Sequence, residues 1–249
     1  MDLRTGTSGF AYPQWRGSFY PADLKNDAML SYYAARLATV EINNTFYRMP
    51  KPAVVQSWLA AVPAHFTFTI KASQRITHFA KLTGEDAAKS MAYLWQVLTE
   101  ASALPQLACV LLQTPPYLRC NDAALTALTT LAALAPAGAR VAWELAHHSW
   151  ANAEVASVLF PRGQTVVVAD KDTGTFDWQA PVYQDQPFAY VRLRRDNYTS
   201  AEIQHWLDTL AARQPGDAYV YFKHEDTARG AEMALECAAL AARRTPPSQ

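Results

Sequence analysis

Short apolar segments alternate along this chain with amphipathic stretches whose apolar residues recur every three or four positions. The short segments are predicted to be strands and the amphipathic stretches to be helices. We expect strands at residues 3–7, 39–43, 66–71, 107–113, 140–145, 164–169, 188–193 and 218–223. We expect helices at residues 27–37, 52–62, 86–102, 121–135, 151–159, 200–213 and 228–243.

This order predicts an α/β protein, a (β/α)8 TIM-like barrel with about eight parallel strands and about seven helices. An open doubly wound sheet fits less well, because no Gly-rich dinucleotide fingerprint follows the first strand. Residues 171–187 have no helical period, so the sixth crossover is expected to be a long loop. No linker or repeat divides the chain. We therefore expect one TIM-like barrel domain over residues 1–244, with 245–249 as a disordered tail.

Several predicted strands carry charged or amide side chains where apolar ones are expected, since strands joined by helices are normally buried on both faces. Burying an ionised group costs roughly several kcal/mol unless it is paired, so these residues indicate a site. In a barrel, alternate side chains point inward and function lies at the carboxyl ends of the strands. The inward set is expected to be Thr5, Thr7, Glu41, Asn43, Thr69, Lys71, Gln113, Glu144, Asp170, Arg192, Arg194, Tyr221 and Lys223.

Charge is distributed unevenly between this set and the whole protein. Lys plus Arg equals Asp plus Glu at 22 each, and the predicted pI is 7.0, so a general basic coat for nucleic acid or membrane is not indicated. The mouth of the barrel is nevertheless expected to be net positive. Its acidic members are Glu41, Glu144 and Asp170, its basic members are Lys71, Arg192, Arg194 and Lys223, and nearby loops add Arg48, Arg75 and His78.

This polar, net-positive mouth favours a phosphorylated or otherwise anionic small ligand, as in a hydrolase- or isomerase-type enzyme. Lys71, Arg192 and Lys223 would hold the anion, and Glu41 or Glu144 would move a proton. The catalytic candidates are therefore Glu41, Lys71, Glu144 and Lys223. Asn43 and Gln113 would bind the remaining polar groups of the ligand. A Schiff-base lysine at Lys71 or Lys223 would need a lowered pKa, which neighbouring cations can provide.

Two other classes of protein remain open. In a nucleic-acid-directed barrel, a nuclease or a damage-binding protein, Tyr12, Trp15 and Tyr47 would stack on bases while Arg48, Arg75 and Arg195 meet phosphates. The aromatic loop over residues 9–21 can equally pack on itself. The third class is a non-catalytic binding barrel. The charges can also be structural ion pairs, with Glu41 pairing Lys71 and Glu144 pairing Arg192.

No cofactor is expected. A divalent metal held by Glu144, Asp170, His78 and His224 is disfavoured by the cations in the same mouth. No stretch approaches the roughly 18 apolar residues of a membrane span, and the N-terminus lacks an apolar signal core, so we expect a cytoplasmic protein. Cys109 is expected in the core. Oligomeric state stays open.

A set of motifs in fixed order resembles the YecE-like family, also called domain of unknown function 72. The motifs are Thr7–Tyr12, Trp15, Phe19–Pro21, Val40–Arg48, Lys71–Ala72, Ile76–His78, Leu111–Pro116, Glu144, Ser149–Trp150, Tyr190–Leu193 and Tyr221–Phe222. The resemblance covers nearly the whole chain and implies a TIM-barrel fold without implying an activity. Members commonly have His-Gly where this chain has Arg194 and Arg195, and Asn-rich residues where Lys223–Asp226 stand.

Overall fold

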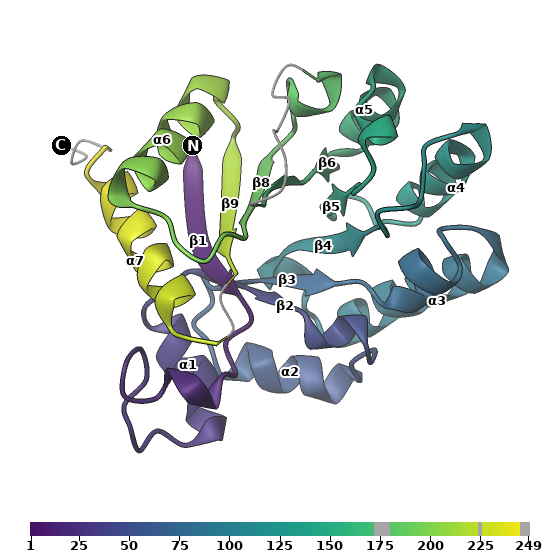
Figure 1. Ribbon diagram of the computed structural model, residues 1–249. Helices are drawn as coiled ribbons and strands as arrows, with labels where there is room; N and C mark the ends of the chain where they lie inside the picture. The colour runs from purple at the N-terminus through teal and green to yellow at the C-terminus, as the bar shows by residue number, and fades with distance from the viewer. Residues whose placement is uncertain (172–179, 224–225, 245–249) are drawn as a thin grey trace.

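The computed structural model describes residues 1–171, 180–223 and 226–244, which form one parallel sheet surrounded by helices (Figure 1). The strands are β1 (Asp2–Ser8), β2 (Thr39–Ile42), β3 (Thr67–Lys71), β4 (Leu107–Gln113), β5 (Val141–Glu144), β6 (Thr165–Val166), β7 (Val168–Asp170), β8 (Ala189–Leu193) and β9 (Asp217–Phe222). The α-helices of the described residues are α1 (Met29–Ala34), α2 (Pro52–Ala60), α3 (Gly84–Glu100), α4 (Asp122–Ala132), α5 (Ala153–Leu159), α6 (Ser200–Arg213) and α7 (Arg229–Ala242).

The sheet is a nearly closed barrel. Its strand order is β6-β5-β4-β3-β2-β1-β9-β8-β7, and every pairing is parallel. The strand expected at 164–169 is divided at Val167: β6 pairs with β5, and β7 pairs with β8. The two halves of this one segment are therefore the two edge strands of the sheet, and the barrel is nearly closed between them. The predicted TIM-like barrel is confirmed.

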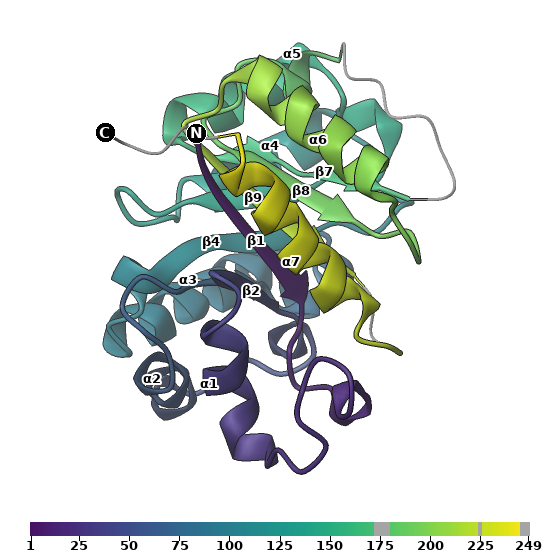
Figure 2. The ribbon, with the colours of Figure 1, turned by 90° about the vertical axis from the view of Figure 1, so that its left-hand side faces the viewer.

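Each side of the sheet is packed. Outside, the strands bury apolar side chains against the helices, and Figure 2 shows α7 lying along β1 and β9. Inside, a separate apolar cluster fills the barrel and includes Cys109, Tyr190 and Tyr221. The Tyr221 hydroxyl lies 2.8 Å from Thr39 Oγ1 and 2.9 Å from Thr69 Oγ1, which satisfies these polar atoms in the interior. The barrel is thus a filled core whose polar residues gather at one end.

Side-chain caps start several of the helices that follow the strands. The side-chain oxygen of Asn121 accepts a hydrogen bond from the Ala124 backbone N–H at the start of α4. Thr199 and Glu202 form a reciprocal capping box at the start of α6. Such caps satisfy backbone groups that a helix end leaves unpaired, so they define where these helices begin.

The side chains of β1 that point into the barrel are not the ones expected. Thr5 Oγ1 donates to the Ala234 carbonyl of α7 at 3.0 Å, and Thr7 Oγ1 lies 2.9 Å from the Tyr33 hydroxyl of α1. The prediction that Thr5 and Thr7 face inward is therefore wrong. Ser8 faces the barrel interior instead, because its hydroxyl bonds Glu41. Threonine suits a helix-facing position because its methyl group packs while its hydroxyl finds a backbone partner.

The sixth crossover joins β7 to β8. Its described residues, Lys171 and 180–188, contain a short 3-10 helix over Pro181–Tyr183 and no α-helix. Residues 172–179 of the expected loop, and the expected tail at 245–249, lie outside the described residues. None of the helices in the described ranges combines the length and apolar character that a bilayer crossing requires.

Candidate functional site at the barrel mouth

A buried guanidinium joins two carboxylates at the carboxyl end of the barrel. Arg192 on β8 donates from Nη2 to Glu41 Oε1 on β2 at 2.7 Å, and from Nη1 to Glu144 Oε2 on β5. Arg192 is 2% exposed and Glu41 is 0% exposed. The expectation that these charges converge at one end is thus met, and of the two structural ion pairs considered, only Glu144 with Arg192 forms.

Glu41 has polar partners besides Arg192. The Ser8 hydroxyl donates to Glu41 Oε1 at 2.8 Å, and the Tyr190 hydroxyl donates to Oε2 at 2.6 Å. Burial raises the pKa of Tyr190 well above its usual value, so this hydroxyl stays a donor. The carboxylate has a donor on each oxygen and is held in one orientation.

Glu144 forms ion pairs with several cationic side chains. Its Oε1 accepts from Gln113 Nε2 at 3.0 Å and from Arg194 Nη1 at 3.3 Å, and lies 3.6 Å from Lys171 Nζ. Burial alone would raise the pKa of Glu144, but Arg192, Arg194 and Lys171 outweigh it and hold the pKa at about 2. Glu144 is therefore a fixed negative charge at neutral pH and a poor proton donor.

Arg192 is equally fixed. Burial acts to lower its pKa, yet the attraction of Glu41 and Glu144 raises the pKa above its usual value. Both terminal nitrogens are occupied by the two carboxylates, while the buried Nε–H has no hydrogen-bond partner among the described residues. The expected contact from Arg192 to a ligand anion is therefore not available through these two nitrogens, because the two carboxylates already bind them.

Lys71, at the end of β3, differs from these paired charges. Its Nζ makes no hydrogen bond or ion pair with any described residue and lies 4.3 Å from the centre of the Phe46 ring. Burial lowers the pKa of Lys71 to about 8, with Arg192 as the next cause, against the opposing effect of Glu41 and Glu144. Lys71 is therefore able to gain and lose a proton near neutral pH.

His78 contacts the same Phe46 ring in a T-shaped arrangement. The ring centres of Phe46 and His78 lie 5.0 Å apart at 86°, and His78 Nδ1 lies 2.8 Å from Thr77 Oγ1. Burial, and then the charge of Lys71, lower the pKa of His78 below its usual value. Phe46 thus brings together two groups whose protonation is disfavoured.

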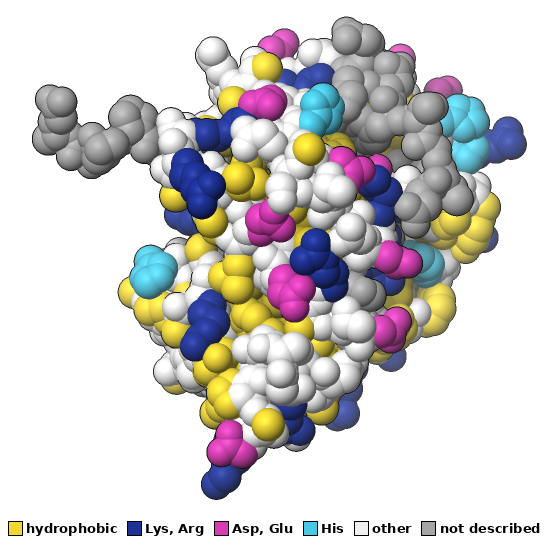
Figure 3. Space-filling view, turned by 60° about the vertical axis from the view of Figure 1, so that its left-hand side comes forward, with side chains coloured by type: hydrophobic (Ala, Val, Ile, Leu, Met, Phe, Trp, Pro, Cys, Tyr) yellow, Lys and Arg dark blue, Asp and Glu magenta, His cyan; other side chains and the backbone are white. Residues whose placement is uncertain are grey.

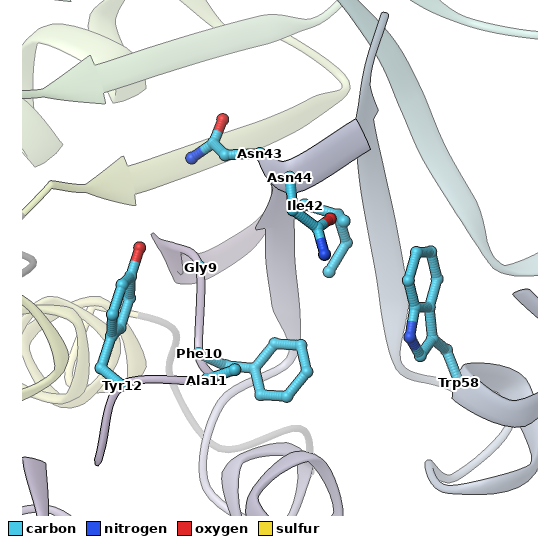
Figure 4. Close-up of a pocket in the computed structure, with 8 residues that line it drawn as sticks. All are labelled: Gly9, Phe10, Ala11, Tyr12, Ile42, Asn43, Asn44 and Trp58. Atoms are coloured by element: carbon cyan, nitrogen blue, oxygen red, sulfur yellow. The ribbon is translucent and has the colours of Figure 1, made fainter. Parts of the chain in front are cut away.

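A pocket of about 290 Å³ lies beside the mouth, between the loop after β1, the end of β2 and Trp58 of α2 (Figure 4). Figure 4 shows the rings of Phe10 and Trp58 on opposite sides of it, and the Asn43 amide pointing away from Trp58. Asn43 follows β2, and its buried Oδ1 has no hydrogen-bond partner in the part of the chain that the structure describes. Within the described ranges, Asn43 Oδ1 and Arg192 Nε are thus two buried polar atoms of the mouth that lack a partner.

Asp170 lies outside this cluster. Its Oδ2 accepts from Arg195 Nε at 3.0 Å and from the Tyr198 hydroxyl at 3.0 Å, on the helix side of β7. The expected inward position of Asp170 is wrong by one residue, because Lys171 is the residue that reaches Glu144. Arg195 is likewise bound to Asp170 and Glu202, so the expected phosphate contact is occupied by protein carboxylates.

The aromatic loop after β1 packs on itself. Trp15 is 0% exposed, and its ring contacts those of Tyr12, Phe19 and Tyr20 at centre distances of 4.8, 5.7 and 5.9 Å. The Tyr12 hydroxyl donates to the Ser8 carbonyl at 2.7 Å. Base stacking by Trp15 is therefore excluded by its burial, and the alternative of a packed loop is confirmed.

Three loop residues of the expected binding set line one pocket that Arg192 does not line. Tyr47, Arg48 and Arg75 line a pocket of about 430 Å³ with Lys89 and Tyr93. Tyr47 is 75% exposed. This second pocket therefore gathers three of the six residues of the nucleic-acid hypothesis, whereas Tyr12, Trp15 and Arg195 do not line it.

Lys223 follows β9, where its backbone N–H donates to the Leu193 carbonyl at 2.9 Å. No three His, Cys, Asp or Glu side chains of the described residues gather as a metal site would require. His224, one of the four metal candidates, lies outside the described residues, so the metal expectation stays a prediction.

Sequence reasoning missed four residues of the mouth: Ser8, Phe46, Lys171 and Tyr190. Tyr190 had a usable signal, because it stands two positions before Arg192 on one strand and so shares its face. Phe46 had none, since it lies on the 3-10 turn Asn44–Phe46, where strand alternation does not apply.

Comparisons with known proteins agree on the fold. The model of a family described as "Protein of unknown function DUF72" matches residues 4–249. A DUF72 family protein from Thermotoga maritima is 25% identical, with a TM-score of 0.81, covering 97% of this chain and 100% of that chain. One from Enterococcus faecalis is 17% identical, with a TM-score of 0.78, covering 99% of both chains.

A more distant match is the 3-keto-D-glucoside 4-epimerase of E. coli, 12% identical with a TM-score of 0.54, covering 98% of this chain and 99% of that chain. At this identity the likeness shows the fold alone. No curated protein matches the chain.

Proposed function

Because the chain belongs to the DUF72 family of proteins of unknown function, as its motifs indicated, we propose a function from the chemistry of its own barrel mouth: an enzyme that binds a small ligand bearing a phosphate or carboxylate group. One observation carries this proposal. Four described cations, Lys71, Lys171, Arg192 and Arg194, surround two carboxylates, Glu41 and Glu144. The excess positive charge stands where barrels bind their ligands.

The contacts to the anion come from the rim of this cluster. Arg192 is committed to Glu41 and Glu144, whereas Lys71 has no polar partner among the described residues and Arg194 has a single contact to Glu144, at 3.3 Å. Lys71 and Arg194 are therefore the proposed anion contacts, and Asn43 is the proposed contact for a neighbouring hydroxyl or amide of the ligand.

Proton transfer falls to different residues than the sequence suggested. The pKa of Glu144 is about 2, so it serves as a fixed charge. The pKa of Lys71 is about 8 and that of His78 is lowered, which suits a proton-transfer pair at neutral pH. A hydrolase or isomerase reaction is consistent with such a pair.

Calorimetric titration at low salt tests the anion site. The probes are inorganic phosphate, dihydroxyacetone phosphate and pyruvate, and the variants are Lys71→Met and Arg194→Met. Arg36→Met is the control, since Arg36 is an exposed cation just beyond α1, at the opposite end of the barrel. We expect each mouth variant to weaken binding by about tenfold, the effect of roughly 1.4 kcal/mol, and the control to bind as the wild type. Absence of binding by every probe, or equal loss in Arg36→Met, would contradict the proposal.

The second pocket supports an alternative, a barrel directed to single-stranded nucleic acid. Tyr47 and Tyr93 offer rings, and Arg48, Arg75 and Lys89 offer phosphate contacts around one cavity. On the face that carries α7, by contrast, Figure 3 shows Lys and Arg side chains interspersed with Asp and Glu over the part that the structure describes.

Salt dependence separates the two functions. Binding of an oligonucleotide across several phosphates falls steeply with salt, whereas one small anion gives a shallow slope. A short single-stranded oligonucleotide that binds with a steep slope, and that is weakened by Arg75→Met but not by Arg194→Met, would favour the nucleic-acid function. Ligand binding without turnover would favour a non-catalytic barrel.

A further inference from the structure

Lys71 is set apart from the other cations of the mouth by its lack of polar partners. Arg192 bonds two carboxylates, and Arg194 and Lys171 contact Glu144. The Nζ of Lys71 makes no hydrogen bond or ion pair with any described residue, although the side chain is half-buried. An amine that is neither tied to a carboxylate nor sealed from solvent is open to reaction.

The position of this amine is nevertheless well defined. Thr45 Oγ1 donates to the backbone carbonyl of Lys71 at 2.7 Å and lies 2.9 Å from the Ile42 carbonyl, which fastens the Asn44–Phe46 turn to the end of β3. The turn carries Phe46, whose ring face lies 4.3 Å from Nζ. The position of Lys71 Nζ is therefore defined by β3 and by the Phe46 ring of the neighbouring turn.

Burial of Lys71 and the neighbouring arginines favour the neutral amine. Burial is the largest cause, and Arg192 the next, of a pKa of about 8. About one molecule in ten then has a neutral Nζ at pH 7, against fewer than one in a thousand for an exposed lysine. The same cations that disfavour the ammonium attract an anionic ligand.

We propose that Lys71 forms an imine with a carbonyl carbon of the anionic ligand. This inference rests on the proposed function, because the cations of the mouth must first bring the ligand to Lys71. The ligand class is a small molecule that bears both an aldehyde or ketone and a phosphate or carboxylate group.

The step balances without an oxidant or reductant. The lone pair of neutral Nζ attacks the carbonyl carbon, and an Nζ proton passes to the carbonyl oxygen to give a carbinolamine. The second Nζ proton and the hydroxyl group then leave as water, and a carbon–nitrogen double bond forms. His78, whose ring contacts that of Phe46, is the neighbouring base that relays these protons.

The imine activates the ligand carbon that is adjacent to the former carbonyl carbon. When its nitrogen is protonated it withdraws electrons, so a proton on the adjacent carbon becomes acidic or an adjacent carbon–carbon bond becomes breakable. Arg194, the other proposed anion contact, holds the anionic end of the ligand while this occurs. The reaction class is therefore isomerisation or carbon–carbon bond cleavage next to a carbonyl.

Reduction of the imine by borohydride tests the proposal. The full chain is incubated with pyruvate or with dihydroxyacetone phosphate, treated with sodium borohydride, digested and mapped by mass spectrometry. We expect a covalent adduct on Lys71 in preference to the exposed Lys25 and Lys89. Inorganic phosphate in excess should suppress the adduct, because it competes for the same cations.

Lys71→Arg separates the imine from the anion site, since it keeps the positive charge and removes the nucleophile. Phosphate binding by this variant within about threefold of wild type, together with complete loss of the adduct, supports both proposals. Lys71→Met, which removes charge and nucleophile together, should lose the adduct and weaken phosphate binding.

The outcomes distinguish the two failures. If wild type binds phosphate but neither carbonyl probe leaves an adduct on Lys71, or if the adducts are spread over Lys25 and Lys89 alike, the imine proposal is overturned and the anion site stands. If phosphate does not bind wild type, the proposed function fails first.

Discussion

The ammonium of Lys71 rests on the face of the Phe46 ring, with 4.3 Å between Nζ and the ring centre. An aromatic face attracts a cation, so this contact favours the protonated form, whereas burial favours the neutral one. The pKa of Lys71 is thus a balance between the ring and its surroundings.

Replacing Phe46 by Leu shifts that balance. Loss of a cation–π contact of roughly 0.5–1 kcal/mol should lower the pKa of Lys71 by about half a unit below about 8. The pH dependence of Lys71 acylation, followed by peptide mass spectrometry, measures this value. Phe79→Leu is the matched control, since Phe79 is 69% exposed on the segment that carries His78. A rise in the pKa, or an equal fall in both variants, would contradict the argument.

Arg192→Met leaves two buried carboxylates without their shared partner. We expect a loss of about 3–5 kcal/mol in the free energy of unfolding, measured by urea denaturation at pH 7. Arg195→Met, at a more exposed ion pair, should cost about 1 kcal/mol or less.

The pH dependence of this loss has a definite sign. In the wild type Arg192 helps to hold the pKa of Glu144 at about 2, and in the variant that pKa rises, so protonating Glu144 relieves the unpaired charge. The Arg192→Met protein should therefore lose less stability at pH 4 than at pH 7. Equal losses at both pH values would show that Glu144 does not respond to Arg192.

Lys71→Met should stabilise the protein at pH 7 by about 1 kcal/mol, since it removes a half-buried cation that has no carboxylate partner. The folded pKa of about 8 lies below the unfolded value of 10.5, so the unfolded chain holds the extra proton between these values. Wild-type stability then rises with pH through this window, and the advantage of Lys71→Met shrinks. Thermal unfolding at pH 7 and pH 9.5 measures both; a gain that grows with pH would reverse the sign of the argument.

Gly9→Ala should disrupt the packed loop after β1. Gly9 has φ of 99°, and an added Cβ would lie 2.3 Å from the Tyr12 hydroxyl that bonds the Ser8 carbonyl. Gly17→Ala is the control, with φ of 81° but open space around the added carbon. Both variants incur roughly 1–2 kcal/mol of backbone strain, and Gly9→Ala should incur more. Equal unfolding free energies would mean that Tyr12 moves aside without cost.

Charged residues in strands were predictable because only one face of the sheet can accept them. Glu41, Glu144 and Arg192 face inward as expected, since the outer face is covered by apolar helix surfaces. Thr5 and Thr7 carried no such information, because a threonine hydroxyl finds partners on either side. The facing of β1 therefore could not be read from its sequence.

Pairing was harder to predict than position. The adjacent residues Asp170 and Lys171 point to opposite faces of the sheet. A shift of one residue in the register of the strand decides which of them reaches Glu144. Arg192 was expected to hold a ligand, yet its two carboxylate partners come from distant strands. Which cations stay unpaired depends on distances across the barrel that a sequence does not contain.

The division of one segment into β6 and β7 leaves a seam in the ring of backbone hydrogen bonds, with β5 on one side and β8 on the other. The side-chain ion pair between Glu144 on β5 and Arg192 on β8 spans that seam. This ion pair therefore also links β5 to β8 across the place where the barrel lacks backbone pairing between β6 and β7. Binding of an anion at the mouth should therefore slow the hydrogen exchange of backbone amides along β5 to β8, including amides that the anion does not contact.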